Sequence, residues 1–422
     1  MGASLLVSSR SIGLNDNGTR YLAFVSCAGT ATTEANVEMP VRQAGTFGNL
    51  YIYASTNTQG VTSVFTVRKS VADTAITVSY TAGQTGVKED TSNTEAFAST
   101  DEIALKVVLP SDPGTTTITV EVVGIQFTPD TSTNTVSSIG GTESVVVSSE
   151  SATRFIAVSG DLDDQATESI TSWRVRGSFT IRDFYVNVSA NARTTDTTFG
   201  TRKNAGAGTI SVTYTSGQTG VKEDTSNSDS VAAGDDVNFY VTTSTGTESL
   251  AVRAIYAHVV STAGQFPFIN QDASGESVAA NVTTFAGVAG YLATFSATEA
   301  NRQFLPRVTF TAKELCTNVS ANTLALLTTT VTIRINGAES AVTLSYAAGE
   351  TGVKNDGTNS ATVTAGSDEI DYEVATPITT GTITFRTISM LGEIAAAGFD
   401  PATFPRAFYL DQYRQLPEIV GY

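Results

Sequence analysis

The sequence has very few of the residues that metal centres and nucleophilic catalysis require. Its 422 residues include one histidine, His258, and two cysteines, Cys27 and Cys316. Zinc sites need clustered cysteine and histidine ligands, and hydrolase triads need a histidine base. His258 stands alone in the segment AIYAHVV, and no glycine-rich phosphate-binding motif occurs. We therefore expect no catalytic residues and a protein that is not an enzyme.

Long hydrophobic runs are also missing. No stretch of about eighteen apolar residues occurs, so no transmembrane helix and no membrane partner are expected. The first residues have a short apolar patch but no signal-type hydrophobic core. Cys27 and Cys316 do not occupy corresponding places in the repeats described below, which predicts two buried thiols and no disulfide.

Charged residues make up only 15% of the chain, and the net charge is −17. An acidic surface repels phosphate backbones, so nucleic acid is not an expected partner. Thr, Ser, Ala, Val and Gly take the place of the charged residues. This composition favours β-strands joined by tight turns.

One eleven-residue segment occurs three times. Residues 83–93 read GQTGVKEDTSN, residues 217–227 repeat these letters without change, and residues 349–359 read GETGVKNDGTN. The copies begin 134 and then 132 residues apart. Such a segment does not recur by chance, so the chain is interpreted as a tandem array of units of common domain size. We call this segment the signature.

The repeat divides the chain into three domains and a tail. Polar, Gly-containing stretches at residues 128–141 and 261–288 are interpreted as linkers. We accordingly place three β-sandwich repeats and an aromatic C-terminal arm at residues 1–128, 140–262, 275–394 and 395–422.

Apolar and hydroxyl residues alternate in short segments about ten residues apart, as in a β-sandwich. Such segments precede every signature: ITVSY at 76–80, ISVTY at 210–214 and VTLSY at 342–346. Seven or eight strands per repeat and no amphipathic helix can be read from the pattern. We predict an all-β protein of three tandem, jelly-roll-like sandwiches. An immunoglobulin-like strand order stays open, although the Cys…Trp…Cys pattern is absent and Trp173 is the only tryptophan.

The signature itself is interpreted as a turn followed by a polar loop. Gly83 and Gly86 suit backbone positions with positive φ. Val87, Val221 and Val353, which occupy the same place in the three copies, are predicted to point inwards.

The acidic residues of the signature suggest calcium as the one cofactor to consider. Asp90 with Asn93, and Asp224 with Asn227, offer hard oxygen ligands within one segment. The alternative is that these side chains hydrogen-bond their own backbone in a turn. Carboxylate pairs such as Glu89 with Asp90 would also suit a glycosidase. A pair that recurs in the repeats is better explained as an element of the fold.

The arm differs from the rest of the chain because it is rich in aromatic residues and prolines. Its aromatic side chains are Phe399, Phe404, Phe408, Tyr409, Tyr413 and Tyr422. A segment of this kind builds no core of its own, so we expect it either to fold back on the third repeat or to dock on another subunit.

The signature resembles a repeat module of virion structural proteins in tailed bacteriophages. The resemblance rests on the pattern T-G-V-x-x-D-T-x-N followed by A-G-D and a strand, which residues 219–237 match best (TGVKEDTSNSDSVAAGDDV). Residues 85–103 lack the A-G-D letters, and residues 351–370 carry Gly357 in place of a threonine. The resemblance spans most of each repeat. It implies jelly-roll-like domains on a particle surface, in fibres, spikes or capsid decorations.

These observations together predict a non-enzymatic structural protein of a tailed-phage virion, made in the host cytoplasm and acting through assembly. We expect a homo-oligomer, with a trimer as the first choice, that contacts other virion proteins. One alternative is a fibre or spike module that binds a host receptor or surface glycan. Another is a bacterial surface or filament protein, which would need an export route.

Overall fold

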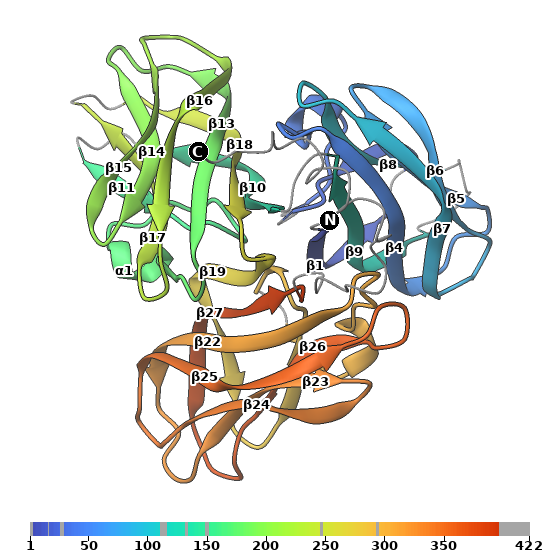
Figure 1. Cartoon of the computed structure of the whole chain (residues 1–422), viewed down its shortest axis with the longest axis vertical. Coiled ribbons are helices and arrows are strands. Elements are labelled where there is room, and N and C mark those ends of the chain that lie inside the picture. Colours follow the sequence, from blue (N-terminus) through green and yellow to red (C-terminus); the bar gives the residue numbers. More distant parts are fainter. Residues whose placement is uncertain are drawn as a thin grey trace, which may run out of the picture.

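The computed structural model describes residues 3–15, 17–25, 29–109, 116–130, 134–147, 152–244, 248–292 and 295–395, and strands dominate it (Figure 1). The helical segments in these ranges are short: α1 (Glu168–Thr171), η1 (Glu34–Asn36) and η2 (Glu299–Asn301). None of them is long or apolar enough to cross a bilayer. The predicted all-β class is confirmed.

Three lobes follow one another along the chain. Lobe 1 contains β1 (Ser4–Leu14), β2 (Gly18–Leu22), β3 (Met39–Pro40), β4 (Gly45–Asn57), β5 (Ser63–Lys69), β6 (Ala72–Tyr80), β7 (Gly86–Phe97), β8 (Glu102–Leu109) and β9 (Ile118–Pro129). Lobe 2 contains β10 (Thr135–Val147), β11 (Thr153–Ile156), β12 (Trp173–Arg174), β13 (Phe179–Asn191), β14 (Thr197–Lys203), β15 (Gly206–Tyr214), β16 (Gly220–Val231), β17 (Asp236–Thr243) and β18 (Leu250–Ser261). Lobe 3 contains β19 (Gln265–Ala279), β20 (Thr283–Ala286), β21 (Gly290–Tyr291), β22 (Phe310–Asn322), β23 (Thr329–Ile335), β24 (Ala338–Tyr346), β25 (Gly352–Val363), β26 (Ile370–Ala375) and β27 (Thr382–Glu393).

Each lobe is a jelly roll. In lobe 1 the two sheets have the orders β1-β9-β4-β7 and β2-β8-β5-β6, so strands pair as nested hairpins from the outermost pair, β1 with β9, to the innermost, β5 with β6. Lobe 2 has the orders β10-β18-β13-β16 and β11-β17-β14-β15, and lobe 3 repeats the arrangement in its own strands. This strand order is the jelly roll, which sequence pattern alone could not separate from an immunoglobulin-like order.

The alternation seen in the sequence is the burial pattern of the strands. In β6, Ile76, Val78 and Tyr80 are buried between the sheets, whereas the intervening Thr77 and Ser79 face solvent. β15 and β24 repeat this pattern. Successive side chains of a strand point to opposite faces, and each fully buried apolar side chain stabilises the fold by about 1.5–3 kcal/mol.

Two interpretations of local structure are wrong. The residues after Gly86, read as a polar loop, form strand β7, and Val87 on it is exposed, as are Val221 and Val353 in the other lobes. The segments read as linkers include the first half of β10 and all of β19, which begin before positions 140 and 275 and belong to the inner sheets of their lobes. In β10, hydroxyl residues such as Thr135, Ser137 and Ser138 obscured the strand. The repeats as separately folding domains stay a prediction.

The lobes form a closed ring around a common centre, and the three first strands, β1, β10 and β19, lie on its inner side (Figure 1). Lobes 1 and 3, although far apart in the sequence, share a nine-stranded sheet, because β1 pairs with β21 in parallel with Ser9 opposite Gly290. The backbone N–H of Ser9 donates to the carbonyl of Ala289 at 2.9 Å. The chain therefore closes on itself.

Candidate functional site

The signature forms the corner at which the chain passes from one sheet of each jelly roll to the other. In lobe 1, Gly83 and Gly86 have φ of 68° and 87°, a conformation that glycine adopts without steric cost. The hydroxyl of Tyr80 lies 2.8 Å from the carbonyl oxygens of Ile52 and Gly86 and so joins both sides of the corner. Tyr214 and Tyr346 make the corresponding contacts in lobes 2 and 3. The signature thus recurs at the corner between the two sheets, which each jelly roll requires.

The calcium candidates are used within this corner. The Asp90 carboxylate accepts hydrogen bonds from the backbone N–H of Thr77 at 2.9 Å and of Asn93 at 3.0 Å, and from the Asn93 amide nitrogen at 2.9 Å. Burial alone would raise the pKa of Asp90, but the bonds from Asn93 and Thr77 hold it below its usual range.

The same network surrounds Asp224 and Asn227 in lobe 2. The structure therefore brings each predicted pair together, with the amide nitrogen rather than the amide oxygen towards the carboxylate. Within the described residues, no group of three or more His, Cys, Asp or Glu side chains is arranged to hold a metal ion. Calcium binding stays a prediction, and the ion would have to replace these hydrogen bonds.

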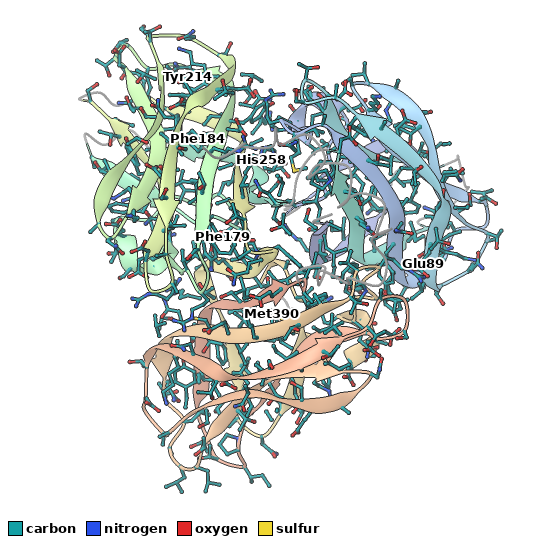
Figure 2. All side chains as sticks on the ribbon, in the orientation of Figure 1. Glu89, Phe179, Phe184, Tyr214, His258 and Met390 are labelled. Carbon is teal, nitrogen blue, oxygen red and sulfur yellow. The ribbon has the colours of Figure 1, made fainter. Side chains whose placement is uncertain are left out.

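The Glu89 and Asp90 carboxylates do not converge as a glycosidase would need. Glu89 precedes Asp90 on β7, and neighbouring side chains of a strand point to opposite faces. Asp90 turns to the inside of lobe 1, whereas Glu89 lies at the border with lobe 3 (Figure 2). There Arg307 of lobe 3 donates two hydrogen bonds to Glu89, one of them at 2.9 Å.

This contact belongs to a cyclic set of three, one at each junction of the ring. Arg42 of lobe 1 binds Glu223 of lobe 2, Arg176 of lobe 2 binds Glu314 of lobe 3, and Arg307 closes the circle on lobe 1. The three arginines occupy the same place in their repeats, 134 and 131 residues apart. The recurrence of these arginines was the only sign in the sequence of the contacts between lobes. The glutamate that binds each arginine lies in a different repeat, so it could not be identified from the sequence.

Apolar contacts accompany the ion pairs at every junction. At the border of lobes 1 and 3, the ring of Phe304 packs edge-on against Tyr51, with centroids 5.4 Å apart. It also covers Gly124, where a Cβ atom would lie 2.4 Å from the Phe304 ring. In lobe 2, the residues that correspond to Tyr51 and Gly124 are Tyr185 and Tyr256. Both tyrosines belong to the buried apolar cluster of lobe 1. At the junction of lobes 1 and 3, the large side chain of Phe304 thus faces a glycine, Gly124.

The inner strands meet at the centre of the ring. The Ser4 hydroxyl of β1 donates to the carbonyl of Val136 on β10, and the Thr135 hydroxyl of β10 donates to the carbonyl of Gln265 on β19. A small cavity of about 20 Å³, room for about one water molecule, lies between them and is lined by Val7, Ser138, Phe268 and their neighbours. Among the described residues, the three inner strands are thus joined at the centre by hydrogen bonds around a space for about one water molecule.

The residues considered for catalysis lie apart. His258 is buried on the side of lobe 2 that faces lobe 1 (Figure 2), with Nδ1 3.6 Å from Oδ2 of Asp183. Cys316 is a buried free thiol near the junction of lobes 2 and 3, and burial raises its pKa to about 12. The prediction of a buried thiol holds for Cys316, whereas Cys27 lies outside the described residues.

The aromatic side chains of the described ranges are not available at loop tips. Every Tyr, Phe and Trp side chain in these ranges is buried or half-buried. A glycan-binding module would show exposed aromatic residues gathered on one loop. The predicted arm residues, Phe399, Phe404, Phe408, Tyr409, Tyr413 and Tyr422, lie outside the described residues.

Comparisons with known proteins add little. No protein-family model matches the chain, and no curated protein sequence matches it. A solved structure of the Gt strain of infectious bursal disease virus aligns with 98% of this chain and 88% of its own, with 8% identity and a TM-score of 0.16. A score of this size does not bear on fold or function.

Proposed function

We propose that the chain is a non-enzymatic structural protein of a tailed-phage virion, a capsid decoration, fibre or tail component that acts through assembly. The observation that carries the proposal is the closed ring of three jelly rolls with a distinct arginine–carboxylate pair at each junction. One chain thereby builds the kind of closed threefold unit that a cyclic homotrimer assembles from three identical chains. The net charge of −17 repels nucleic acid, which suits a structural protein that must not bind the nucleic acid released in a lysate.

A ring of this kind supports a mechanical role. Its core is continuous across the junctions, since the cluster of lobe 3 includes Tyr51 and Val122 of lobe 1 and the cluster of lobe 2 includes Leu391 of lobe 3. Such packing resists separation of the lobes, because each junction buries apolar side chains as the interior of a domain does. The proposed partners are other copies of the chain and further virion proteins, and the proposed location is the virion.

The composition of purified phage particles tests the proposal. Particles from a lysate of cells that express the chain together with its phage are banded by density and analysed by mass spectrometry, and antibodies against the chain are used for electron microscopy. We expect the chain in the particle band in constant ratio to the major capsid protein, and labelling at one part of the particle. A chain found only in the particle-free fraction would contradict a virion role.

A further inference from the structure

Four apolar side chains are exposed together at one end of lobe 3. Val282, Leu326, Leu327 and Ile378 expose 39%, 66%, 67% and 82% of their surface. The same measure finds only four other large apolar side chains exposed in the described ranges, at separate places. We call loops 280–282, 323–328 and 376–381 the lobe-3 tip. Exposed apolar groups gathered in this way are typical of an interaction surface.

Backbone hydrogen bonds hold the three loops of the tip side by side. The N–H of Ala325 donates to the carbonyl of Thr380 at 3.3 Å, and the N–H of Asn281 donates to the carbonyl of Pro377 at 2.8 Å. The carbonyl of Val282 accepts from the backbone N–H of Thr376 at 2.9 Å. The tip is therefore one preformed surface rather than three separate loops.

The jelly roll does not require apolar residues at this place. The loops that correspond to residues 323–328 (TLALLT) are residues 58–62 in lobe 1 (TQGVT) and 192–196 in lobe 2 (ARTTD). Leu327 also has a φ of 65°, a left-handed conformation that glycine or asparagine adopts at lower cost. An exposed leucine at this place packs in no core, and its neighbours in the tip are also apolar, which favours a role in binding.

We propose that the lobe-3 tip binds the aromatic arm, residues 396–422, of a neighbouring copy of the chain. β27 begins at the tip with Thr382 and ends at the far end of lobe 3, where Glu393 pairs with Gln265. The arm thus starts about 40 Å from its own tip, at about 3.3 Å per residue. Binding to its own tip would require the arm to reverse and run back along the whole of β27, whereas a tip on a neighbouring copy requires no such reversal.

The chemistry of the two surfaces is complementary. The arm carries six aromatic residues and hydrophobic side chains such as Leu410 and Ile419. Aromatic anchors that enter an aliphatic surface supply most of the binding energy in typical interfaces. Each copy has one arm and one tip, so the contact is heterologous and joins copies head to tail. The proposal rests on the assembly role proposed above and names the surfaces that carry it.

Complementation between two full-length variants tests this contact. The tip variant carries Leu326→Asp and Ile378→Asp, and the arm variant carries Phe404→Ser, Phe408→Ser and Tyr409→Ser. Val71→Asp is the matched control, because Val71 is an equally exposed valine of lobe 1 (65%). Circular dichroism verifies the fold of each variant, and light scattering at tens of micromolar gives the mass.

The wild type and the control should associate to at least twice the chain mass of 44.0 kDa. Each variant alone should have the mass of one chain, and their equimolar mixture should form a dimer through the one intact arm and the one intact tip. A synthetic peptide of residues 396–422 should dissociate the wild-type assembly. A monomeric wild type, a tip variant that still associates, or a mixture that stays monomeric would overturn arm binding in trans. None of these results bears on whether the chain is found in phage particles. The arm contact and the virion role can therefore fail independently of each other.

Discussion

Arg176 of lobe 2 binds Glu314 of lobe 3, with Nε and Nη2 at 2.9 and 2.5 Å from the same carboxylate oxygen. At the other two junctions the acceptor belongs to the signature, at the position that Asn355 occupies in lobe 3. The third copy of the signature also has Gly357, where a Cβ atom would lie 3.4 Å from the Glu314 carboxylate. The third signature therefore differs from the others at Asn355 and Gly357, and the carboxylate that binds the arginine, Glu314, lies on β22 instead of on the strand of the signature.

Exchanging these two residues tests the relocation. Glu314→Asn removes the acceptor of Arg176 and should lower the free energy of unfolding by about 1 kcal/mol, the size of a partly exposed ion pair with two charge-assisted hydrogen bonds. Adding Asn355→Glu should restore most of the loss, because it returns the acceptor to the signature. Chemical denaturation measures both effects, and Glu350→Gln, at an ion pair within lobe 3, is the control. No recovery in the double variant would contradict the relocation.

Gly124 tests the apolar part of the junction between lobes 1 and 3. Gly124→Ala places a methyl group 2.4 Å from the Phe304 ring and should cost about 1–3 kcal/mol through overpacking. Phe304→Leu in the same chain should recover part of that cost. Gly13→Ala serves as the control, since its new Cβ atom would lie 3.6 Å from the nearest neighbouring atom. Additive effects of the two junction substitutions would show that Phe304 and Gly124 are not in contact.

Asp371 should make the protein less stable as pH rises. Its carboxyl group is fully buried on β26, and burial, reinforced by the charge of Glu299, raises its pKa to about 8. Because the unfolded chain releases this proton near pH 4, folding loses stability between about pH 4 and 8. Asp371→Ala introduces the residue of lobe 1, Ala104, and should raise stability at pH 8 by on the order of 3 kcal/mol. Thermal melts of both chains from pH 4 to 8 test this, and parallel curves would contradict it.

Asp90 should have the opposite dependence. Its folded pKa lies below the usual range, so it stabilises the fold above pH 4, and this contribution is lost as the pH falls through the lowered pKa. Asp90→Ala leaves the N–H groups of Thr77 and Asn93 without their acceptor and should cost about 2–3 kcal/mol at pH 7. Thr91→Ala, at the exposed neighbouring residue, should cost little.

The same melts test the calcium prediction. A calcium-dependent rise in melting temperature that Asp90→Ala or Asp224→Ala reduces would support a metal site in the signature. If the ion leaves wild type and variants unchanged at millimolar concentration, the acidic residues act through hydrogen bonds alone.

The sequence predicted the fold class because strand periodicity and the repeat are local signals. The alternation at Ile76, Val78 and Tyr80 could be read directly, since side chains of a strand alternate between core and solvent. The strands β1, β10 and β19 were missed because both of their faces are buried, so apolar residues occur at successive positions, as at Leu5 and Leu6, and the strict alternation of a half-buried strand is absent. The prediction that Val87 points inwards was wrong because this valine lies at the corner, where it does not follow the alternation of the core and is exposed.

The ring lay beyond sequence reasoning for a different reason. Arg42, Arg176 and Arg307 recur in the repeats, yet a recurring charged residue in the segment before a strand is most simply explained by solvent exposure. Only the placement of one lobe against the next makes them partners of Glu223, Glu314 and Glu89. Contacts between domains depend on positions that are distant in the sequence, which periodicity does not record.

Chemical cross-linking across the junction of lobes 1 and 3 tests most directly whether one chain closes the ring. Glu89→Cys and Arg307→Cys are introduced into a chain whose Cys27 and Cys316 are replaced by serine, and a short bismaleimide is added to dilute protein. A ring closed within one chain predicts a product of 44.0 kDa on a denaturing gel, with a peptide that joins positions 89 and 307. Products of two or more chains at limiting dilution would mean that lobe 3 of one copy packs on lobe 1 of another, and the closed ring would be wrong.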